Sequence, residues 1–167
     1  MEKSVSRVLV LDSTAFYSGF HSTLQGRYFT SHRIMEEIIH IQKYYSIIES
    51  LIISGRLVVL EPTRESQDLV KETAKQIGES DLSSGDISIL SLSHDLLGTI
   101  VTDDYAICNL ASVMSIPTIN LSSKGITQIK KWRTYCRTCG KNYEPNLTVC
   151  LICGNQLRRS FRRYHHK

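Results

Sequence analysis

Hydrophobic and polar positions alternate along the chain in blocks that predict short buried strands separated by helices. The first apolar run, RVLVL at residues 7–11, ends at Asp12, as expected for a buried parallel strand. Three further short apolar runs predict strands at residues 57–60, 100–102 and 117–121. Helices are expected at residues 14–20, 31–54, 65–77, 83–97 and 105–114. This βαβα alternation predicts a three-layer α/β domain in which helices cover a parallel sheet.

The longest predicted helix covers residues 31–54. Its apolar positions recur at helical spacing, namely Ile34, Ile38, Ile41, Tyr45, Ile48 and Ile52. Gly55 follows them as the expected C-cap, and Gly78 plays the same part after the helix at 65–77.

Length and composition favour an ordinary domain with a small appendage. The chain has 167 residues, 41% of them hydrophobic, which is enough for one core. No apolar run approaches the roughly 18 residues that span a bilayer. Residues 1–13 are too short and too acidic for a signal peptide. We therefore expect a soluble cytoplasmic protein with reduced cysteines and no membrane partner.

Charge is distributed unevenly. Residues 124–167 carry eleven Lys or Arg and one acid, Glu144, a net charge of about +10. The other 123 residues carry nine bases and fifteen acids, about −6. The basic end is expected to attract a polyanion, which the acidic body would repel unless cations neutralise it.

Four cysteines form the most specific motif. Cys136 and Cys139, then Cys150 and Cys153, give Cys-x2-Cys, ten residues, Cys-x2-Cys, with a glycine after each pair. Two such knuckles supply four thiolates for one tetrahedral structural zinc. An internal disulfide pair and a redox dithiol are weaker alternatives. Cys108 lies outside the pattern and is expected to be a free thiol in or near the core.

Acidic residues follow the predicted strands or begin helices. Asp12 ends the first strand, and Asp103 and Asp104 follow the strand at 100–102. Asp86 lies in the first turn of a helix, and Glu37 lies on the helix at 31–54. If these carboxylates converge, each close pair repels by about 4 kcal/mol at 4 Å and an effective dielectric of 20. Such a cluster is compatible with Mg²⁺ or Mn²⁺, which prefer oxygen ligands.

Each acid also has a structural explanation. Ser83 and Asp86 have the spacing of a capping box, and Asp103 and Asp104 would stabilise a helix N-terminus. Glu37 is one of two adjacent acids, and Glu36 is the alternative. Spacing alone does not bring the carboxylates together.

Three segments, followed by the cysteine ribbon, resemble a known family. They are VLVLDST (residues 8–14), LSSGDISILSLS (82–93) and TIVTDDYAICNLA (99–111). Together they resemble PIN domains, and with the ribbon they resemble the Nob-type (NIN-one-binding) endonucleases of ribosome maturation. The resemblance extends from residue 8 to about residue 159. It implies a PIN-like domain at 1–125, a linker at 126–134, a zinc ribbon at 135–157 and a basic tail at 158–167.

The resemblance also implies an activity and its residues. The family cleaves precursor small-subunit rRNA at its 3′ end, on the pre-small ribosomal subunit. Its metal-binding acids correspond to Asp12, Glu37, Asp86 and Asp104, with Asp103 beside them, and its hydroxyl residues to Thr14 and Thr102. One or two Mg²⁺ or Mn²⁺ ions would activate water and neutralise the scissile phosphate. The histidines are scattered and are expected to be surface or structural residues.

The basic end is the expected RNA-binding surface. Its candidate residues are Lys130, Lys131, Trp132, Arg133, Arg137, Arg158, Arg159, Arg162 and Arg163. Cations would contact phosphates, and aromatic rings would stack on unpaired bases. The alternatives are that Trp132 and Tyr135 pack the ribbon against the main domain and that the tail is a disordered solvated run.

Two other functions fit the same residues. The chain could be a non-catalytic RNA-binding assembly factor, or a toxin-like PIN nuclease with a broader RNA target.

Overall fold

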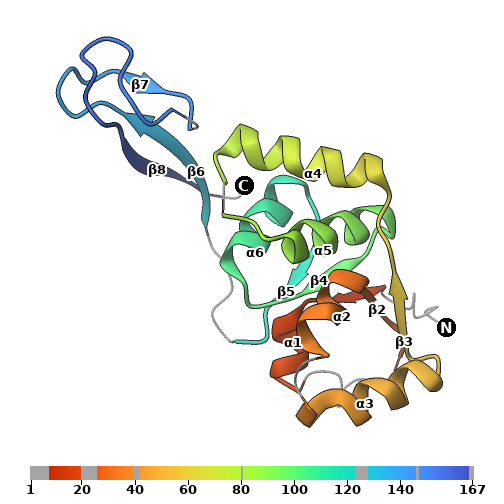
Figure 1. Ribbon diagram of the computed structural model, residues 1–167. Coiled ribbons are helices and arrows are strands. Elements are labelled where there is room, and N and C mark those ends of the chain that lie inside the picture. Colours follow the sequence, from red (N-terminus) through yellow and green to blue (C-terminus); the bar gives the residue numbers. More distant parts are fainter. Residues whose placement is uncertain are drawn as a thin grey trace.

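The computed structural model describes residues 8–19, 26–39, 42–79, 81–122, 128–145 and 147–165, with the backbone alone at 42–44, 128–129 and 162–165. Figure 1 shows a helix-covered sheet from which a ribbon with its own small sheet, in the order β7-β6-β8, projects. The strands are β1 (Leu9–Leu11), β2 (Tyr28–Ser31), β3 (Leu57–Leu60), β4 (Thr99–Val101), β5 (Thr118–Ile119), β6 (Gln128–Tyr135), β7 (Asn142–Tyr143) and β8 (Arg158–His165). The helices are α1 (Ser13–Tyr17), α2 (His32–Ile38), α3 (Gln42–Ile53), α4 (Arg64–Ile77), α5 (Ser84–Asp95) and α6 (Tyr105–Val113).

Five parallel strands form the main sheet in the order β3-β2-β1-β4-β5, which confirms the α/β prediction. The strands β1 and β4 are neighbours, with Leu11 paired to Val101. Both strands end at the same edge, so the residues that follow them, Asp12 and Thr102, come together although they are ninety positions apart. This edge is where ligands bind in open α/β sheets.

The sheet is buried because its central strands are apolar on both faces. Val10, Leu11, Ile100 and Val101 are fully buried. Helix α5 packs against β1, β2 and β4 and against the helices α2 and α4, which places its N-terminal turn at the edge of the sheet. The core therefore holds fixed the elements that carry the acidic residues.

The predicted helix at residues 31–54 was wrong in its boundaries. Its first residue belongs to β2, and two helices, α2 and α3, replace the single one. The strand β2 was not predicted because two of its residues, Thr30 and Ser31, are polar. Buried Thr30 donates its hydroxyl to Leu11 O at 2.9 Å, and Ser31 caps α2 by accepting from Ile34 N. Of the predicted stripe, Ile34, Ile38 and Ile48 are buried, Tyr45 and Ile52 are exposed, and Ile41 lies outside the described residues.

The C-terminal region is more ordered than the sequence suggested. Most of the expected linker is strand β6, and most of the expected basic tail is strand β8. The two form an antiparallel ladder from Gln128 opposite His165 to Tyr135 opposite Arg158. Neither segment was predicted to be a strand, because their alternating side chains are charged or aromatic rather than apolar. The tail described through residue 165 is therefore a paired strand and not a disordered run.

Gly78 fixes how the ribbon approaches the main domain. It ends α4 in the left-handed conformation with φ +73°, as predicted, which favours glycine. A β-carbon there would also lie 2.7 Å from Pro145 Cβ and 2.9 Å from Trp132 Cβ. The helix terminus is thus shaped both for its own turn and for contact with the ribbon.

Within the described part of the chain, no helix has both the length and the apolar character needed to cross a membrane.

Candidate functional site

Asp12 is the central carboxylate of the sheet edge and is only 2% exposed. Its Oδ2 accepts hydrogen bonds from Thr102 Oγ1 at 2.8 Å and from Thr14 Oγ1 at 2.9 Å. The family resemblance implied both threonines as site residues, and in the structure their hydroxyls orient Asp12.

The same hydroxyls tie Asp12 to the second acidic segment. Thr14 Oγ1 accepts from Asp103 N at 3.1 Å, and Thr102 Oγ1 accepts from Asp104 N at 2.9 Å. Each threonine therefore donates to the first acid while it accepts from the backbone of the other acids. This network fixes the end of β1 relative to the start of α6.

Asp103 and Asp104 are adjacent, but their carboxylates accept hydrogen bonds from different segments of the chain. Asp104 caps α6, with Oδ1 accepting from Ala106 N at 2.7 Å and Ile107 N at 3.1 Å. Asp103 Oδ1 instead accepts from the amides of Leu121 and Ser122 at 2.8 and 2.9 Å. Asp103 thus anchors the segment after β5, while Asp104 remains beside Asp12.

Asp86 forms the predicted capping box with Ser83. Its Oδ2 accepts from Ser83 N at 2.7 Å, and Ser83 Oγ accepts from Asp86 N at 3.1 Å. Burial nevertheless raises the pKa of Asp86, although the two bonds with Ser83 oppose the rise, and the charges of Asp104 and Asp12 raise it further. The structural and electrostatic explanations of this residue are therefore both correct.

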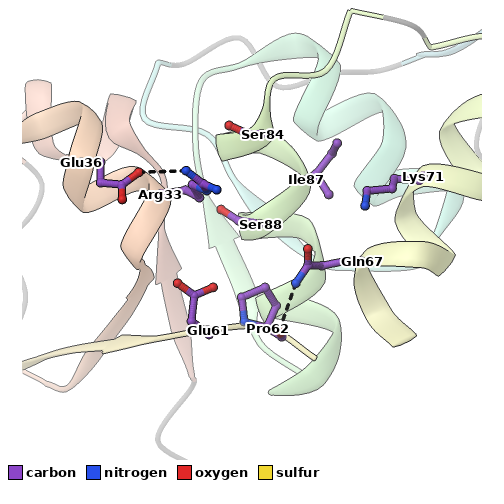
Figure 2. A pocket seen from close by; sticks show the side chains of 9 residues that line it. All are labelled: Arg33, Glu36, Glu61, Pro62, Gln67, Lys71, Ser84, Ile87 and Ser88. Atoms are coloured by element: carbon purple, nitrogen blue, oxygen red, sulfur yellow. Dashed lines mark hydrogen bonds and ion pairs between the residues drawn. The ribbon is translucent and has the colours of Figure 1, made fainter. Parts of the chain in front are cut away.

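Glu37, rather than Glu36, faces the other acids. Burial, Asp12 and Asp86 together raise the pKa of Glu37. Its carboxylate lies against α5, where a β-carbon on Gly85 would collide with Glu37 Oε1. Glu36 points elsewhere and pairs with exposed Arg33 at 3.1 Å (Figure 2).

The structure therefore brings four predicted carboxylates from four separate segments near one another: Asp12 and Asp86 act on Glu37, and Asp104 and Asp12 act on Asp86. They do not form a closed cage. Among the described residues, the cysteines are the only group of three or more candidate ligands whose atoms all lie within 4.8 Å of one another. One oxygen each of Asp86 and Asp104 is committed to a helix cap, and no hydrogen bond within the described chain occupies the other. This oxygen set suits a hard divalent cation.

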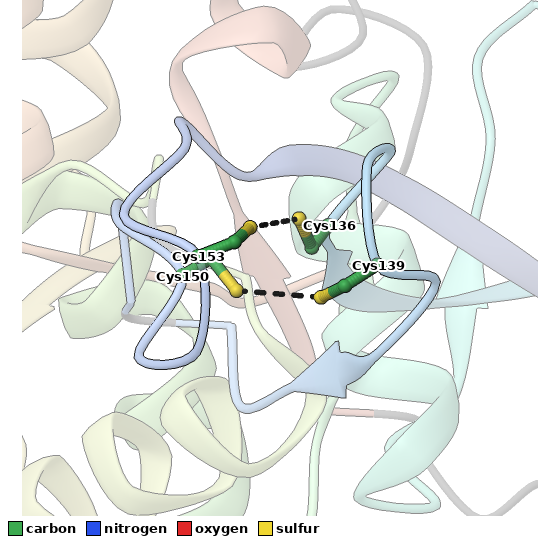
Figure 3. A group of neighbouring side chains, drawn as sticks. All are labelled: Cys136, Cys139, Cys150 and Cys153. Carbon is green, nitrogen blue, oxygen red and sulfur yellow. Dashed lines mark hydrogen bonds between the residues drawn. The ribbon is translucent and has the colours of Figure 1, made fainter.

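The four cysteines converge as predicted, and none is in a disulfide (Figure 3). The Sγ atoms of Cys136 and Cys153 are 3.4 Å apart, and those of Cys139 and Cys150 are 3.5 Å apart. Ligands at about 2.3 Å from a tetrahedral zinc would be about 3.8 Å from one another. The donor set fits that ion and leaves no open position for substrate.

The two knuckles have the same backbone structure. Gly140 N donates to Cys136 O at 2.9 Å, and Gly154 N donates to Cys150 O at 3.0 Å. Tyr143, which the sequence did not single out, contacts Cys150 Sγ through its hydroxyl at 3.0 Å. Although burial opposes ionisation, this bond and the amides of Cys153 and Ile152 lower the pKa of Cys150 to about 6. Deprotonated thiolates are the form that binds metal.

Cys108 is a buried thiol, as expected, and burial raises its pKa to about 11. Its Sγ donates to Asn120 Oδ1 at 3.2 Å.

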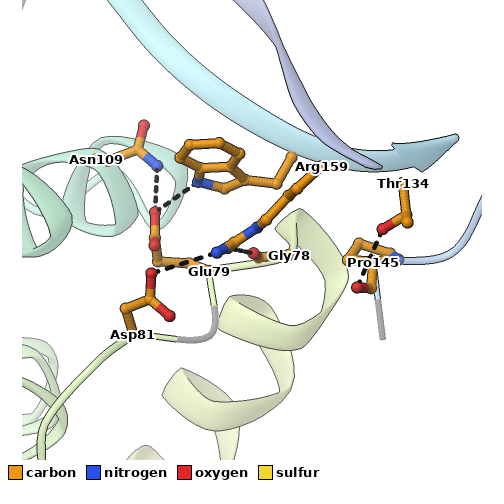
Figure 4. Close-up of polar contacts among 8 residues, drawn as sticks. Gly78, Glu79, Asp81, Asn109, Thr134, Pro145 and Arg159 are labelled. Carbon is orange, nitrogen blue, oxygen red and sulfur yellow. Dashed lines mark hydrogen bonds and ion pairs between the residues drawn. The ribbon is translucent and has the colours of Figure 1, made fainter. Parts of the chain in front are cut away.

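A polar junction between the ribbon and the main domain was missed by the sequence analysis (Figure 4). Buried Glu79 accepts from Trp132 Nε1 at 3.2 Å and from Asn109 Nδ2 at 3.3 Å. Asn109 also bonds both backbone groups of Lys130, at 2.8 and 3.0 Å. An asparagine within the apolar run of α6 was the available signal, because a buried amide requires partners.

Two of the predicted RNA-binding residues belong to this junction. The Trp132 ring packs edge-on against Phe161, with centroids 5.3 Å apart, and the Arg159 guanidinium lies 4.3 Å from the Trp132 centroid. Arg159 also bonds Gly78 O at 2.5 Å and Asp81 at 3.2 Å. The structure therefore favours the packing alternative for Trp132.

The other predicted cations lie along the ribbon. Lys131, Arg137 and Arg158 are exposed, and Arg133 is half-buried and donates to Ser160 Oγ at 3.2 Å. Lys130 Nζ lies 4.1 Å from the centroid of the Tyr105 ring. Tyr105 directly follows Asp104 in the sequence. Arg162 and Arg163 take register positions opposite Lys131 and Lys130.

Comparison with known proteins identifies related sequences and a related fold. The sequence pattern of the family described as "PIN domain of ribonuclease" matches residues 9–96. The chain is 32% identical to the Endoribonuclease Nob1 of Pyrococcus abyssi, over 90% of this chain and 91% of that protein. It is 30% identical to the Ribonuclease VapC1 of Thermoplasma acidophilum, over 95% of this chain and 80% of that protein. The fold is similar to that of PAE2754 from Pyrobaculum aerophilum, with TM-score 0.50 and 15% identity over 71% of this chain and 92% of that one.

The raised pKa of Glu37 predicts that this carboxylate destabilises the protein when no divalent cation is present. A raised folded pKa means that stability falls as pH rises from 4.5, the ordinary value, through the folded value. At pH 7.5 without Mg²⁺ or Mn²⁺, we expect Glu37→Gln to raise the free energy of unfolding by about 0.5 kcal/mol, a figure kept small because the side chain is largely solvated. Urea denaturation at pH 7.5 and pH 4 measures this gain, which should disappear at the lower pH.

Glu36→Gln is the matched control, because it removes a neighbouring charge that lies outside the cluster. Equal effects of the two substitutions would contradict the placement of Glu37 among the acids.

Proposed function

Since the chain belongs to the PIN-domain ribonucleases, and within them to the Nob1 endoribonucleases, we propose that it acts by divalent-metal-dependent hydrolysis at the carboxylates of its sheet edge. It is an endoribonuclease of rRNA maturation. Its substrate is precursor small-subunit rRNA, cleaved at the 3′ end, and its partner is the pre-small ribosomal subunit in the cytoplasm. Family membership supports this assignment over a non-catalytic assembly factor.

The observation that carries the proposed mechanism is the convergence of Asp12, Glu37, Asp86 and Asp104. Desolvation and mutual repulsion raise the pKa values of Glu37 and Asp86, so the cluster is costly as bare carboxylates. A bound cation relieves that cost and supplies the positive charge that an RNA phosphate needs in order to approach.

Each residue has a part in holding that charge. Thr14 and Thr102 occupy Asp12 Oδ2 and orient the carboxylate. Asp86 and Asp104 each present an oxygen left open by their helix caps, and Glu37 closes the cluster from α2. Bound Mg²⁺ or Mn²⁺, one or two ions, would activate water for attack and stabilise charge on the scissile phosphate and its leaving oxygen.

The histidines of the described chain are not needed as bases. His94 lies near the end of α5 opposite to Asp86, and its Nδ1 is bonded to Ser66 Oγ at 2.9 Å.

The outer face of the β6–β8 ladder is the proposed surface for the RNA backbone. Directly opposite residues of an antiparallel ladder share a face. Trp132 and Phe161, then Thr134 and Arg159, form the inner face at the junction. The outer face consequently holds Lys131, Arg133 opposite Ser160, and Tyr135 opposite Arg158. The cations on this face can contact phosphates without disturbing the junction.

The cysteine site is proposed to hold one structural zinc. Four ligands complete its tetrahedron, so the ion shapes the end of the ribbon and takes no part in hydrolysis.

A broader, toxin-like RNA target is the second candidate, because the chain is also similar to Ribonuclease VapC1 over 95% of its length. Preferential cleavage of free tRNA or mRNA over a precursor rRNA 3′ junction would favour this candidate.

Removing one proposed metal ligand should abolish cleavage. We expect Asp104→Asn to lower the rate on labelled precursor rRNA with Mn²⁺ by about 100-fold or more, because the positive charge at the phosphate is lost. Asp103→Asn is the adjacent control, since its Oδ1 remains an acceptor for Leu121 and Ser122. Equal losses in the two variants would contradict the separate roles of these neighbours.

The threonine network gives a finer test. Thr102→Val removes the hydroxyl that orients Asp12 and should weaken Mn²⁺ affinity about 10- to 100-fold, as removal of supporting groups around metal ligands commonly does. Thr102→Ser keeps the hydroxyl and should bind Mn²⁺ almost as wild type. Calorimetric titration measures both, and indistinguishable affinities would remove Thr102 from the supporting network.

The outer face should determine RNA affinity and its salt dependence. The double variant Lys131→Ala, Arg158→Ala should bind precursor rRNA more weakly and reduce the slope of log affinity against log salt by about 2. A charge-matched control, Arg64→Ala with Lys75→Ala on α4, should leave the slope unchanged. Fluorescence anisotropy from 50 to 300 mM salt makes the comparison, and an unchanged slope in the ribbon variant would exclude this face.

Loss of zinc should separate binding from hydrolysis. Elemental analysis should find one zinc per chain, and Cys139→Ser should reduce it. The variant should bind long precursor RNA more weakly while it still cleaves a short substrate, because the core of the main domain does not include the ribbon. Equal loss of both activities would show instead that zinc supports the whole fold.

A further inference from the structure

A pocket of about 420 Å³ lies beside the proposed catalytic site, between α2, α4 and the N-terminal half of α5 (Figure 2). Its size is within the range of small-molecule sites. Five charged or amide side chains surround it, namely Arg33, Glu36, Glu61, Gln67 and Lys71. None of them has a part in the mechanism proposed above, and Glu36, the alternative to Glu37 in the sequence, lines this pocket instead.

The pocket and the acidic cluster share a wall. On α2, Glu36 lines the pocket, while the next residue, Glu37, faces Asp12 and Asp86. On α5, Ser84 lines the pocket, while Asp86, two residues later, faces Asp104 and Asp12. The pocket and the acidic cluster are therefore formed by closely spaced residues of the same two helices.

The pocket's charges are balanced, unlike those of a phosphate site. Arg33 and Lys71 are offset by Glu36 and Glu61, and the acids would repel an anion. The cations are held by exposed ion pairs, Arg33 with Glu36 at 3.1 Å and Lys71 with Asp68 at 3.8 Å. Such pairs are worth little, so both cations are free to exchange partners at small cost.

This mixture suits the edge of a nucleobase, which has both donors and acceptors. Arg33, Lys71 and Gln67 supply donors, and the two glutamates supply acceptors. Gln67 is already oriented by donating Nε2 to Pro62 O at 3.2 Å. Buried Pro62 and half-buried Ile87 add apolar surface to the lining. Unpaired RNA bases are recognised in this way, by hydrogen bonds at the edge and by contact with the ring face.

We propose that this pocket receives the base of a nucleotide adjacent to the scissile phosphodiester and gives the enzyme a nucleotide preference at that position. The proposal rests on the nuclease function above and adds a specificity site to it.

Binding is tested without cleavage. The full-length zinc-loaded protein, without Mg²⁺ or Mn²⁺, is titrated by NMR with each of the four ribonucleoside 5′-monophosphates and with ribose 5-phosphate. At least one nucleotide should shift the Gln67 side-chain amide and the Ser84 and Ile87 backbone amides more than ribose 5-phosphate does. Gln67→Ala and Lys71→Ala should each weaken that nucleotide about 2- to 10-fold, the effect of one lost hydrogen bond.

Gln76→Ala and Lys75→Ala are the matched controls, because they make the same changes on the same helix without lining the pocket. No shift with any nucleotide, or equal shifts with ribose 5-phosphate, would overturn the base pocket.

Specificity is then tested with Mn²⁺ on short RNAs randomised on both sides of the cut. The wild type should prefer one or two nucleotides at one flanking position, and the pocket variants should reduce that preference about 2- to 10-fold while the controls retain it. Cleavage with the same preference in all variants would refute the pocket. Absence of cleavage by the wild type would instead refute the proposed function, and nucleotide binding would still decide whether the pocket accepts a base.

Discussion

Mutual repulsion among carboxylates at one edge of the sheet is the constraint around which this protein is built. Asp12 is almost fully buried, and desolvation raises the pKa values of Glu37 and Asp86 nearby. A fold tolerates such a cluster only if other interactions hold the acids in place. Here the hydroxyls of Thr14 and Thr102 orient Asp12, while helix caps hold Asp86 and Asp104. The stabilising interactions and the proposed ligand positions are thus different oxygens of the same side chains.

The ribbon supplies the opposite charge and is joined to the main domain by a few directional contacts. Glu79 and Asn109 bind Trp132 and the backbone of Lys130, so the base of the ladder follows α6. Lys130 thereby reaches Tyr105, the residue after Asp104. By itself, an acidic site repels a polyanion, whereas a basic surface attracts one. Joined in this way, they form the path that we propose for an RNA strand, from the ribbon toward the cations at the acids.

The sequence supplied the candidate residues of the site but could not give their arrangement in space. Asp86 forms a capping box and also faces the cluster, so its structural role is compatible with the functional role proposed for it. The resemblance favoured Glu37 over the adjacent Glu36, and the orientation of α2 beside Gly85 places Glu37, not Glu36, toward the other acids. Trp132 and Arg159 look like RNA contacts by composition, yet the ladder register turns them inward to Glu79 and Asp81.

Local chemistry explains what the sequence determined by itself. Three kinds of feature depend only on neighbouring residues and short-range periodicity: the matched knuckles, the glycine caps and the apolar strands β1, β3 and β4. Such local patterns can be recognised from the sequence alone. The strand β2 and the ladder β6–β8 were missed because partners distant in sequence, and not their own hydrophobicity, make them strands. Only the tertiary structure could decide which carboxylates converge, because their separation is set by parallel pairing of β1 with β4 and by the packing of α2 and α5 on that sheet.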